Sequence, residues 1–222
     1  MIHVLDICGT FVFAVSGAFR AVRHQLDLLG VLVLAIATGV GGGIVRDLTL
    51  GATPPAAFQD ETYLAVCLLG GLVVFFAAHR IAPHWDSVMA ADAVGLSVFA
   101  ALGAAKADQY GLGVIGVVMM AAVTATGGGV IRDMLVGEIP AVLHADFYAT
   151  AALAGGACYV AAGHLGAGQG VQLLAAAIVT FVLRVLAMKY GISLPKIHSL
   201  PASPSKLTSL RKSKRDCDLG DK

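Results

Sequence analysis

The chain contains the stretch TGVGGGIVRD at residues 38–47 and a second version of it, TATGGGVIRD, at residues 124–133. The offset of 86 positions between these stretches also relates residues 6–60 to residues 92–146 without a gap. An offset that never slips is typical of a duplicated structural unit. We therefore interpret the chain as a tandem repeat.

The composition indicates a membrane protein. Hydrophobic residues make up 58% of the chain and charged residues 13%, with a mean hydropathy of +0.83, whereas a soluble domain has about 25% charged residues. A spanning helix needs about 20 residues, so the sequence predicts an all-α integral membrane protein with seven transmembrane helices. We expect these helices near residues 4–22, 28–50, 62–80, 89–106, 112–136, 147–164 and 169–190.

The predicted helices divide the chain into two triplets and one extra helix. Residues 1–86 form the first three-helix repeat and residues 87–166 the second, followed by a seventh helix at 167–191. Because three is an odd number, the second copy enters the bilayer from the opposite face, and the repeats are inverted. Residues 192–222 are rich in Ser, Pro, Lys and Arg, which predicts a disordered basic tail attracted to anionic lipids.

Basic residues gather at one set of helix ends. Arg20 and Arg23 follow the first predicted helix, Arg80 follows the third, and Lys206 and Arg211 follow the seventh. The positive-inside rule then places the N-terminus outside and the C-terminus in the cytoplasm, in the inner (cell) membrane. A net charge of +1 gives no indication of a nucleic-acid partner.

The sequence offers no motif for catalysis or metal binding. Its four cysteines form no CxxC pair, and neither HExxH nor GxSxG occurs. We therefore predict no catalytic residue, no metal, no cofactor and no enzyme activity.

Two glycine triplets are the strongest local feature. Glycine costs about 1 kcal/mol relative to alanine inside a helix, so each triplet weakens its helix by about 3 kcal/mol. We expect the second and fifth helices to break there, which would free backbone carbonyls that suit a cation. The alternative is that glycine lets two helices pack closely. The triplets are Gly41, Gly42, Gly43 and Gly127, Gly128, Gly129.

Charged residues within the predicted helices form a second candidate set. Each costs about 2.5 to 3.5 kcal/mol in a spanning helix, so we expect a partner on another helix or contact with water. Neighbours in sequence point to different faces of a helix, so we expect each Arg to pair with an acid elsewhere. Snorkelling to the headgroups is the alternative for the basic side chains. The set is Arg46, Asp47, Arg132, Asp133, Lys106, Asp6 and Asp92.

On the paired GGG-[IV]-[IV]-R-D-[LM] motifs, the chain resembles the prokaryotic branch of the trimeric intracellular cation channel family, also catalogued as a glycine-transporter domain family. The resemblance covers residues 1 to about 190. It implies a homotrimer with a pore in each protomer, kinks at the glycine triplets, and the charged residues along that pore. Animal members bind a phosphoinositide through basic residues near the kinks, and the lysine-glutamate-valine signature of those members is absent from this chain.

We therefore expect a monovalent cation channel permeable to K⁺ and Na⁺, gated by voltage or lipid. The basic residues Arg46, Arg132 and Lys106 would be gating charges held by the acids of the set. The expected partners are the permeant cation, membrane lipids including anionic ones, and two further copies of the chain. The alternative is a secondary transporter of a small zwitterion such as glycine, because inverted repeats with broken helices are equally typical of transporters.

Overall fold

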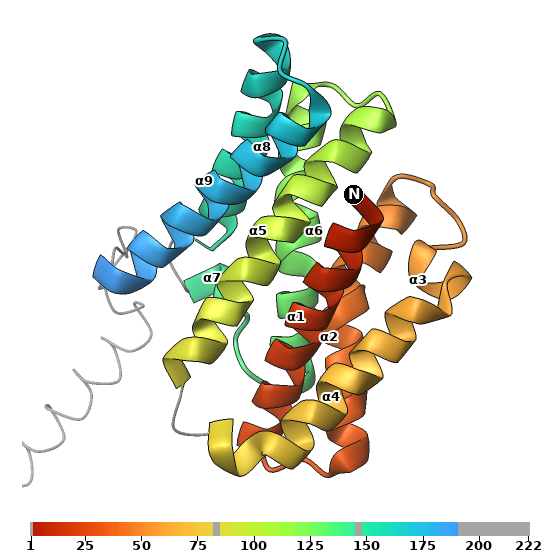
Figure 1. Ribbon diagram of the computed structural model, residues 1–222, viewed down its shortest axis with the longest axis vertical. Helices are drawn as coiled ribbons and strands as arrows, with labels where there is room; N and C mark the ends of the chain where they lie inside the picture. Colours follow the sequence, from red (N-terminus) through yellow and green to blue (C-terminus); the bar gives the residue numbers. More distant parts are fainter. Residues whose placement is uncertain (1, 82–84, 145–147, 191–222) are drawn as a thin grey trace, which may run out of the picture.

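The computed structural model describes residues 2–81, 85–144 and 148–190, and the regular structure of these residues is entirely helical (Figure 1). The predicted tail at 192–222 lies outside the described residues. The helices are α1 (Ile2–Arg23), α2 (Leu28–Thr49), α3 (Ala56–Gln59), α4 (Glu61–Ile81), α5 (Trp85–Gln109), α6 (Val114–Leu135), α7 (Ala141–His144), α8 (Ala149–His164) and α9 (Gln169–Tyr190).

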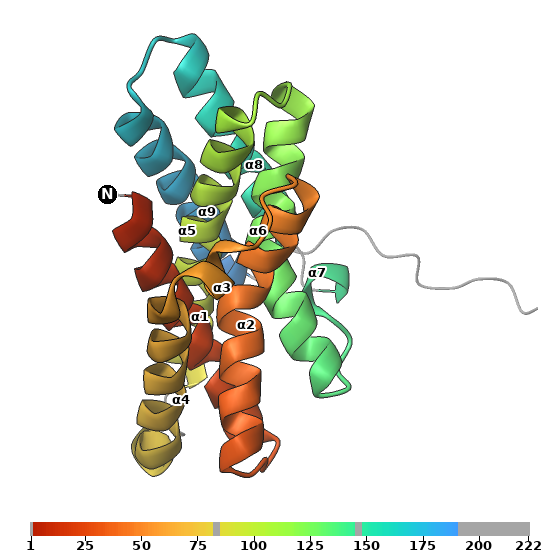
Figure 2. The same cartoon turned by 90° about the vertical axis from the view of Figure 1, so that its right-hand side faces the viewer.

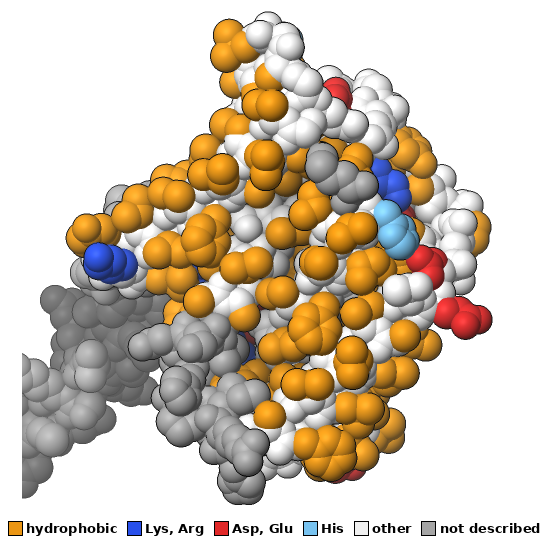
Figure 3. Space-filling model, viewed as in Figure 1, with side chains coloured by type: hydrophobic (Ala, Val, Ile, Leu, Met, Phe, Trp, Pro, Cys, Tyr) orange, Lys and Arg blue, Asp and Glu red, His pale blue; other side chains and the backbone are white. Residues whose placement is uncertain are grey.

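Each of the seven segments predicted from the sequence coincides with one of the longer helices. Five of these helices, α1, α2, α5, α6 and α9, are long and apolar enough to cross a membrane. Large hydrophobic side chains lie on the outside, and they cover most of the face in Figure 3, where the charged side chains lie toward the edges. An apolar surface of this extent fits a lipid environment, which confirms the prediction of an all-α membrane protein.

Equivalent helices of the two repeats run in opposite directions. In Figure 1, α1 runs down the page from the N-terminus while α5 runs up. Figure 2 shows the same relation between α2, which rises, and α6, which descends. α1 packs on α5 and α2 packs on α6, so the repeats meet through pairs of equivalent helices.

The crossing of α1 and α5 is filled by two stacked aromatic rings. Phe13 and Phe99 occupy equivalent positions in the two repeats, and their ring centroids lie 5.2 Å apart with 8° between the planes. Both side chains are buried. The rings fit because each faces a glycine of the other helix: a Cβ atom at Gly95 would lie 2.5 Å from Phe13, and one at Gly9 would lie 3.3 Å from Phe99.

The crossing of α2 and α6 depends on the central glycine of each triplet. A Cβ atom at Gly42 would overlap the backbone carbonyl oxygen of Thr124, and one at Gly128 would overlap that of Thr38. Thr38 and Thr124 are also equivalent positions. The two backbones therefore touch at a point where no side chain fits.

The predicted helix breaks are wrong. α2 is helical without interruption from Leu28 to Thr49, and α6 from Val114 to Leu135. Most helical stability in proteins comes from packing rather than from propensity, and the close contact of the two backbones offsets the cost of the glycines. Close packing, the alternative considered from the sequence, is the observed role of Gly42 and Gly128, and Gly41, Gly43, Gly127 and Gly129 lie within the same continuous helices.

Replacing the central glycines should therefore destabilise the protein. We expect Gly42→Ala and Gly128→Ala to lower the stability by about 1 to 3 kcal/mol each, the usual cost of overpacking. Gly43→Ala is the matched control, because a Cβ there would meet only Arg46 Nη2 at 3.8 Å, and it should be neutral or stabilising by up to about 1 kcal/mol. Thermal unfolding in one detergent measures all three; equal effects would contradict the packing role.

Candidate functional site

Four charged side chains form the first charge cluster, which consists of Asp6, Arg46, Asp47 and Lys106. Asp47 Oδ1 accepts hydrogen bonds from Arg46 Nε at 2.8 Å and from Lys106 Nζ at 2.6 Å. Arg46 Nη2 also lies 3.7 Å from Asp6 Oδ2. Two acids and two bases therefore balance each other inside the protein, as buried charges require.

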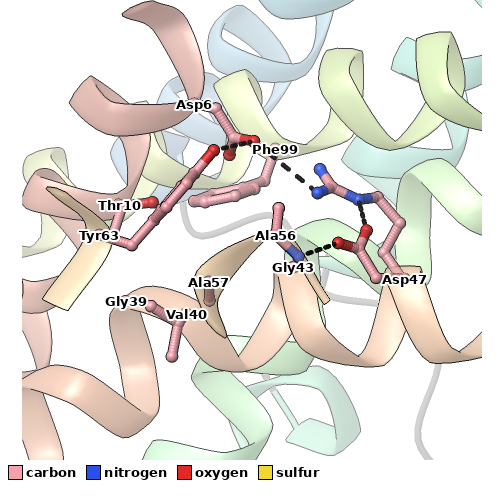
Figure 4. A pocket seen from close by; sticks show the side chains of 11 residues that line it. Asp6, Thr10, Gly39, Val40, Gly43, Asp47, Ala56, Ala57, Tyr63 and Phe99 are labelled. Carbon is pink, nitrogen blue, oxygen red and sulfur yellow. Dashed lines mark hydrogen bonds and ion pairs between the residues drawn. The ribbon is translucent and has the colours of Figure 1, made fainter. Parts of the chain in front are cut away.

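The turn after α2 supports this cluster. Asp47 Oδ2 accepts the backbone N–H of Ala56 at 3.0 Å, at the start of α3 (Figure 4). Tyr63 on α4 donates its hydroxyl hydrogen to Asp6 Oδ2 at 3.0 Å. Both oxygens of Asp47 are thus engaged, and the carboxylate is held between α2, α3 and the second repeat.

The equivalent residues form the second charge cluster: Asp92, Arg132, Asp133 and Arg20. Arg132 Nε donates to Asp133 Oδ1 at 2.9 Å, and Arg132 Nη1 donates to Asp92 Oδ1 at 2.6 Å. Asp133 Oδ2 accepts the backbone N–H of Ala141 at 2.9 Å. Arg20 Nη2 lies 3.7 Å from Asp133 Oδ1. The two clusters therefore repeat the same plan.

The repeats exchange one basic side chain each. Lys106, from the second repeat, pairs with Asp47 of the first, and Arg20, from the first repeat, pairs with Asp133 of the second. Arg20 and Lys106 are equivalent positions. Each cluster thus takes one of its two bases from the other repeat, and Arg20 also donates to Glu138 Oε2 at 2.7 Å.

All seven charged residues proposed from the sequence lie in these clusters, and two details differ from expectation. Arg46 and Arg132 are each 3% exposed, so they do not snorkel to the headgroups. Each also pairs with the Asp that follows it in sequence, which we had expected to face away. The long Arg side chain folds back along the helix, so its guanidinium reaches a carboxylate that starts from another face.

Several site residues escaped the sequence analysis. Tyr63 donates its hydroxyl hydrogen to Asp6, whereas the hydroxyl of Tyr148 is buried without a hydrogen-bond partner among the described residues. The two tyrosines stand 85 positions apart, one residue short of the repeat offset. Arg184 on α9 is buried with its guanidinium carbon 4.8 Å from the centre of the Tyr148 ring. The comparison of the two repeats did not predict this contact, because Arg184 lies in α9, the helix that has no equivalent in either repeat.

Two cavities adjoin the first charge cluster. The larger, of about 210 Å³, could hold several water molecules, and His3, Leu102 and Gln109 are among its lining residues. The smaller, of about 10 Å³, has room for about one water molecule and reaches inward to Gly39, Gly43 and Phe99 (Figure 4). The two cavities share Asp6, Arg46, Ala56 and Tyr63 in their linings.

The smaller cavity ends at the aromatic pair. Phe99 lines it and stacks on Phe13 at the centre of the protein. Thr10 Oγ1, also on its lining, is buried without a hydrogen-bond partner. The two cavities are therefore neighbours that share the polar side chains of Asp6, Arg46 and Tyr63, and the smaller one also reaches Phe99.

Hydrogen bonds keep the loop carboxylates charged near both clusters. His3 Nε2 lies 3.0 Å from Asp60 Oδ2, and hydrogen bonds from Thr62 and then from His3 lower the pKa of Asp60 to about 2. Burial raises the pKa of Glu138, but the hydrogen bond from His24 and the charge of Arg20 outweigh it, so the net shift is downward. Asp60 therefore stays ionised to a lower pH than an ordinary aspartate.

Metal binding has no visible basis in the part of the chain that the structure describes. Within residues 2–81, 85–144 and 148–190, no group of three or more His, Cys, Asp or Glu side chains could hold a metal ion. The charged side chains of the clusters are engaged with one another instead.

A protein-family model described as "Glycine transporter" matches the chain twice, at residues 3–79 and at residues 89–164. The UPF0126 membrane protein of Deinococcus radiodurans is 42% identical over 203 residues, which cover 90% of this chain and 93% of that protein. Both similarities extend over the two charge clusters.

Solved structures are similar over the same range. A TRIC cation channel, solved to explain conductance, is 40% identical with a TM-score of 0.84, over 90% of this chain and 98% of its own. The orthologue of the TRIC trimeric intracellular cation channel from Rhodobacter sphaeroides is 39% identical with a TM-score of 0.82, over 86% of this chain and 98% of its own.

Removing one carboxylate from a cluster should be costly. We expect Asp47→Asn to lower the stability by about 3 to 5 kcal/mol, the usual cost of leaving the partners of a buried ion pair uncompensated. Asp27→Asn is the control: this exposed side chain caps α2 by accepting the N–H of Gly30 at 2.8 Å, and Asn caps a helix equally well. Thermal unfolding compares the two; a small effect at Asp47 would show that the cluster is dispensable for folding.

Proposed function

The chain belongs to the family of prokaryotic TRIC channels, whose model is described as "Glycine transporter", and from this membership we propose that it is a monovalent cation channel permeable to K⁺ and Na⁺. The observation that carries the proposal is the pair of neighbouring cavities inside a single protomer, of about 210 Å³ and about 10 Å³, which share residues of the first charge cluster. We infer that they are parts of one polar passage that ends at Phe99. A passage contained in one chain gives each protomer its own pore.

The aromatic pair is the closed gate of this pore. Phe13 and Phe99 stack at the end of the passage, and their rings offer no oxygen atom to replace the hydration shell of an ion. Apolar constrictions of this kind gate by excluding water. By the repeat symmetry, the ion leaves along the second charge cluster when the two rings separate.

The charge clusters provide the gating charges. A pore beside Arg46, Arg132 and Lys106 would repel cations if these bases were unpaired, but each of them is paired with an aspartate of its cluster. One elementary charge that crosses the membrane field is worth about 2.3 kcal/mol per 100 mV, so movement of one basic side chain couples opening to voltage. Lipid binding is a second candidate stimulus.

The glycine triplets support the pore rather than open it. Gly42 and Gly128 fix the crossing of α2 and α6, and Gly39 and Gly43 line the smaller cavity. Gly42 and Gly128 keep α2 and α6 close together, and the passage beside them stays narrow as a result.

The assembly and membrane placement follow the family. We propose a homotrimer in the inner cell membrane, with residues 1–86 and 87–166 as inverted three-helix repeats, 167–191 as the seventh spanning helix, and an extracellular N-terminus. The orthologue from Rhodobacter sphaeroides is described as a trimeric channel. A transporter of glycine or another zwitterion is not supported, because the solved relatives are cation channels.

Purified protein in a planar bilayer tests the channel. We expect unitary current steps in symmetric KCl, and we expect Phe99→Ala to raise the open probability because it removes half of the apolar plug. Phe76→Ala is the control, since that ring lies on the outside of α4 and is 78% exposed. Silence of the parent protein at all voltages would refute the channel.

Cysteine labelling tests the orientation. In a background without native cysteines, Phe58→Cys, in α3, should react with an impermeant reagent added outside intact cells. Lys212→Cys, in the basic C-terminal segment, should react only after the cells are opened. The reverse pattern would invert the two mouths of the pore.

A further inference from the structure

We propose that the two equivalent arginines differ in function: Ser16 fixes Arg132 in place, which leaves Arg46 as the arginine that moves during gating. The voltage part of this proposal rests on the proposed channel function. The structural part, that Arg132 is fixed and Arg46 is loosely held, stands without it.

Three acceptors hold Arg132. Its Nη1 atom donates to Ser16 Oγ at 2.7 Å and to Asp92 Oδ1 at 2.6 Å, and its Nε atom donates to Asp133 at 2.9 Å. Ser16 donates its own hydrogen to Asp92 Oδ1 at 3.2 Å. The hydroxyl thus closes a ring of three groups, and each member fixes the other two.

Arg46 lacks the corresponding ring. Its Nε atom donates to Asp47 at 2.8 Å, but its Nη2 atom lies 3.7 Å from Asp6 Oδ2, beyond the length of a direct hydrogen bond. That same oxygen of Asp6 already accepts the hydroxyl of Tyr63 at 3.0 Å. Arg46 is therefore fixed firmly at one end of its guanidinium only.

The repeat register explains the difference. Ser16 is equivalent to Leu102, 86 positions later, and Leu102 lines the cavity of about 210 Å³ together with Arg46. Leu102 cannot bridge an arginine to an aspartate. Where the second cluster has a hydroxyl, the first has an apolar side chain and room for water.

This difference determines how many hydrogen bonds each arginine breaks when it moves. If Arg132 moved, its three acceptors would stay buried without a donor, and an unsatisfied buried acceptor costs free energy. Arg46 can exchange its long contact with Asp6 for water in the adjoining cavity, because water-mediated hydrogen bonds are nearly as favourable as direct ones. The charged groups around Arg46 are Asp6, Asp47 and Lys106, with His3 and Tyr63 on the cavity wall.

Voltage-dependent open probability in a planar bilayer tests the difference. Arg46→Gln should reduce the steepness of the voltage dependence more than Arg132→Gln does, because Arg46 is the arginine that moves in the field. Leu102→Ser should reduce the steepness with Arg46 still present, because the new hydroxyl would hold Arg46 as Ser16 holds Arg132. Leu102→Ala, which removes the same bulk without adding a hydroxyl, should not. Equal loss of steepness in the two Arg→Gln variants would overturn the proposal.

A second measurement does not depend on ion flux. Ser16→Ala should lower the unfolding temperature of the parent protein and have a smaller effect in the Arg132→Gln background, because the hydroxyl acts through Arg132. Leu102→Ser should be more stable than Leu102→Ala only when Arg46 is present. If the parent protein carries no current, the channel fails while these two comparisons still decide the structural part. Absence of both couplings would overturn it.

Discussion

The contact between the backbones of α2 and α6 at Gly42 and Gly128 is the constraint on which the rest of the structure depends. It brings the two repeats together where no side chain fits, and Arg46 and Arg132 lie one helical turn beyond it on either side. Interfaces of membrane helices favour small residues because van der Waals packing replaces the hydrophobic effect there. A wider crossing would separate each carboxylate from the base that the other repeat supplies.

The charge clusters give this framework its chemistry. Buried ion pairs stabilise a protein weakly, since desolvation cancels much of their attraction, yet losing one partner is expensive. Asp47 and Asp133 each bind a neighbouring Arg, a backbone N–H and a base from the other repeat. Such groups hold the repeats in register rather than adding much stability. Charges kept in a membrane at this cost usually serve function, and here two cavities adjoin the first cluster.

The sequence predicted the duplication, the helical membrane fold and seven of the eight charges of the clusters, because matching residues at a fixed offset need no tertiary information. Arg20 was named only for the orientation of the chain. The predicted breaks at the glycine triplets failed because a propensity counts the local cost of glycine and not the contact made across a crossing. Tyr63 and Tyr148 were missed because the loop before them differs by one residue. Ser16 and Leu102 were missed because a comparison of the repeats selects positions with identical residues. These two equivalent positions matter because their residues differ.

The exchange of basic side chains between repeats also bears on the origin of the fold. Asp47 depends on Lys106, and Asp133 depends on Arg20, so a single repeat would carry a buried carboxylate without its full set of partners. An ancestor of half the length would therefore have needed a second copy inserted in the opposite orientation, as an antiparallel homodimer. In a homodimer of identical halves both copies carry the same residue at this position, so a difference such as Ser16 against Leu102 requires the two halves to be encoded separately, as they are in this duplicated chain.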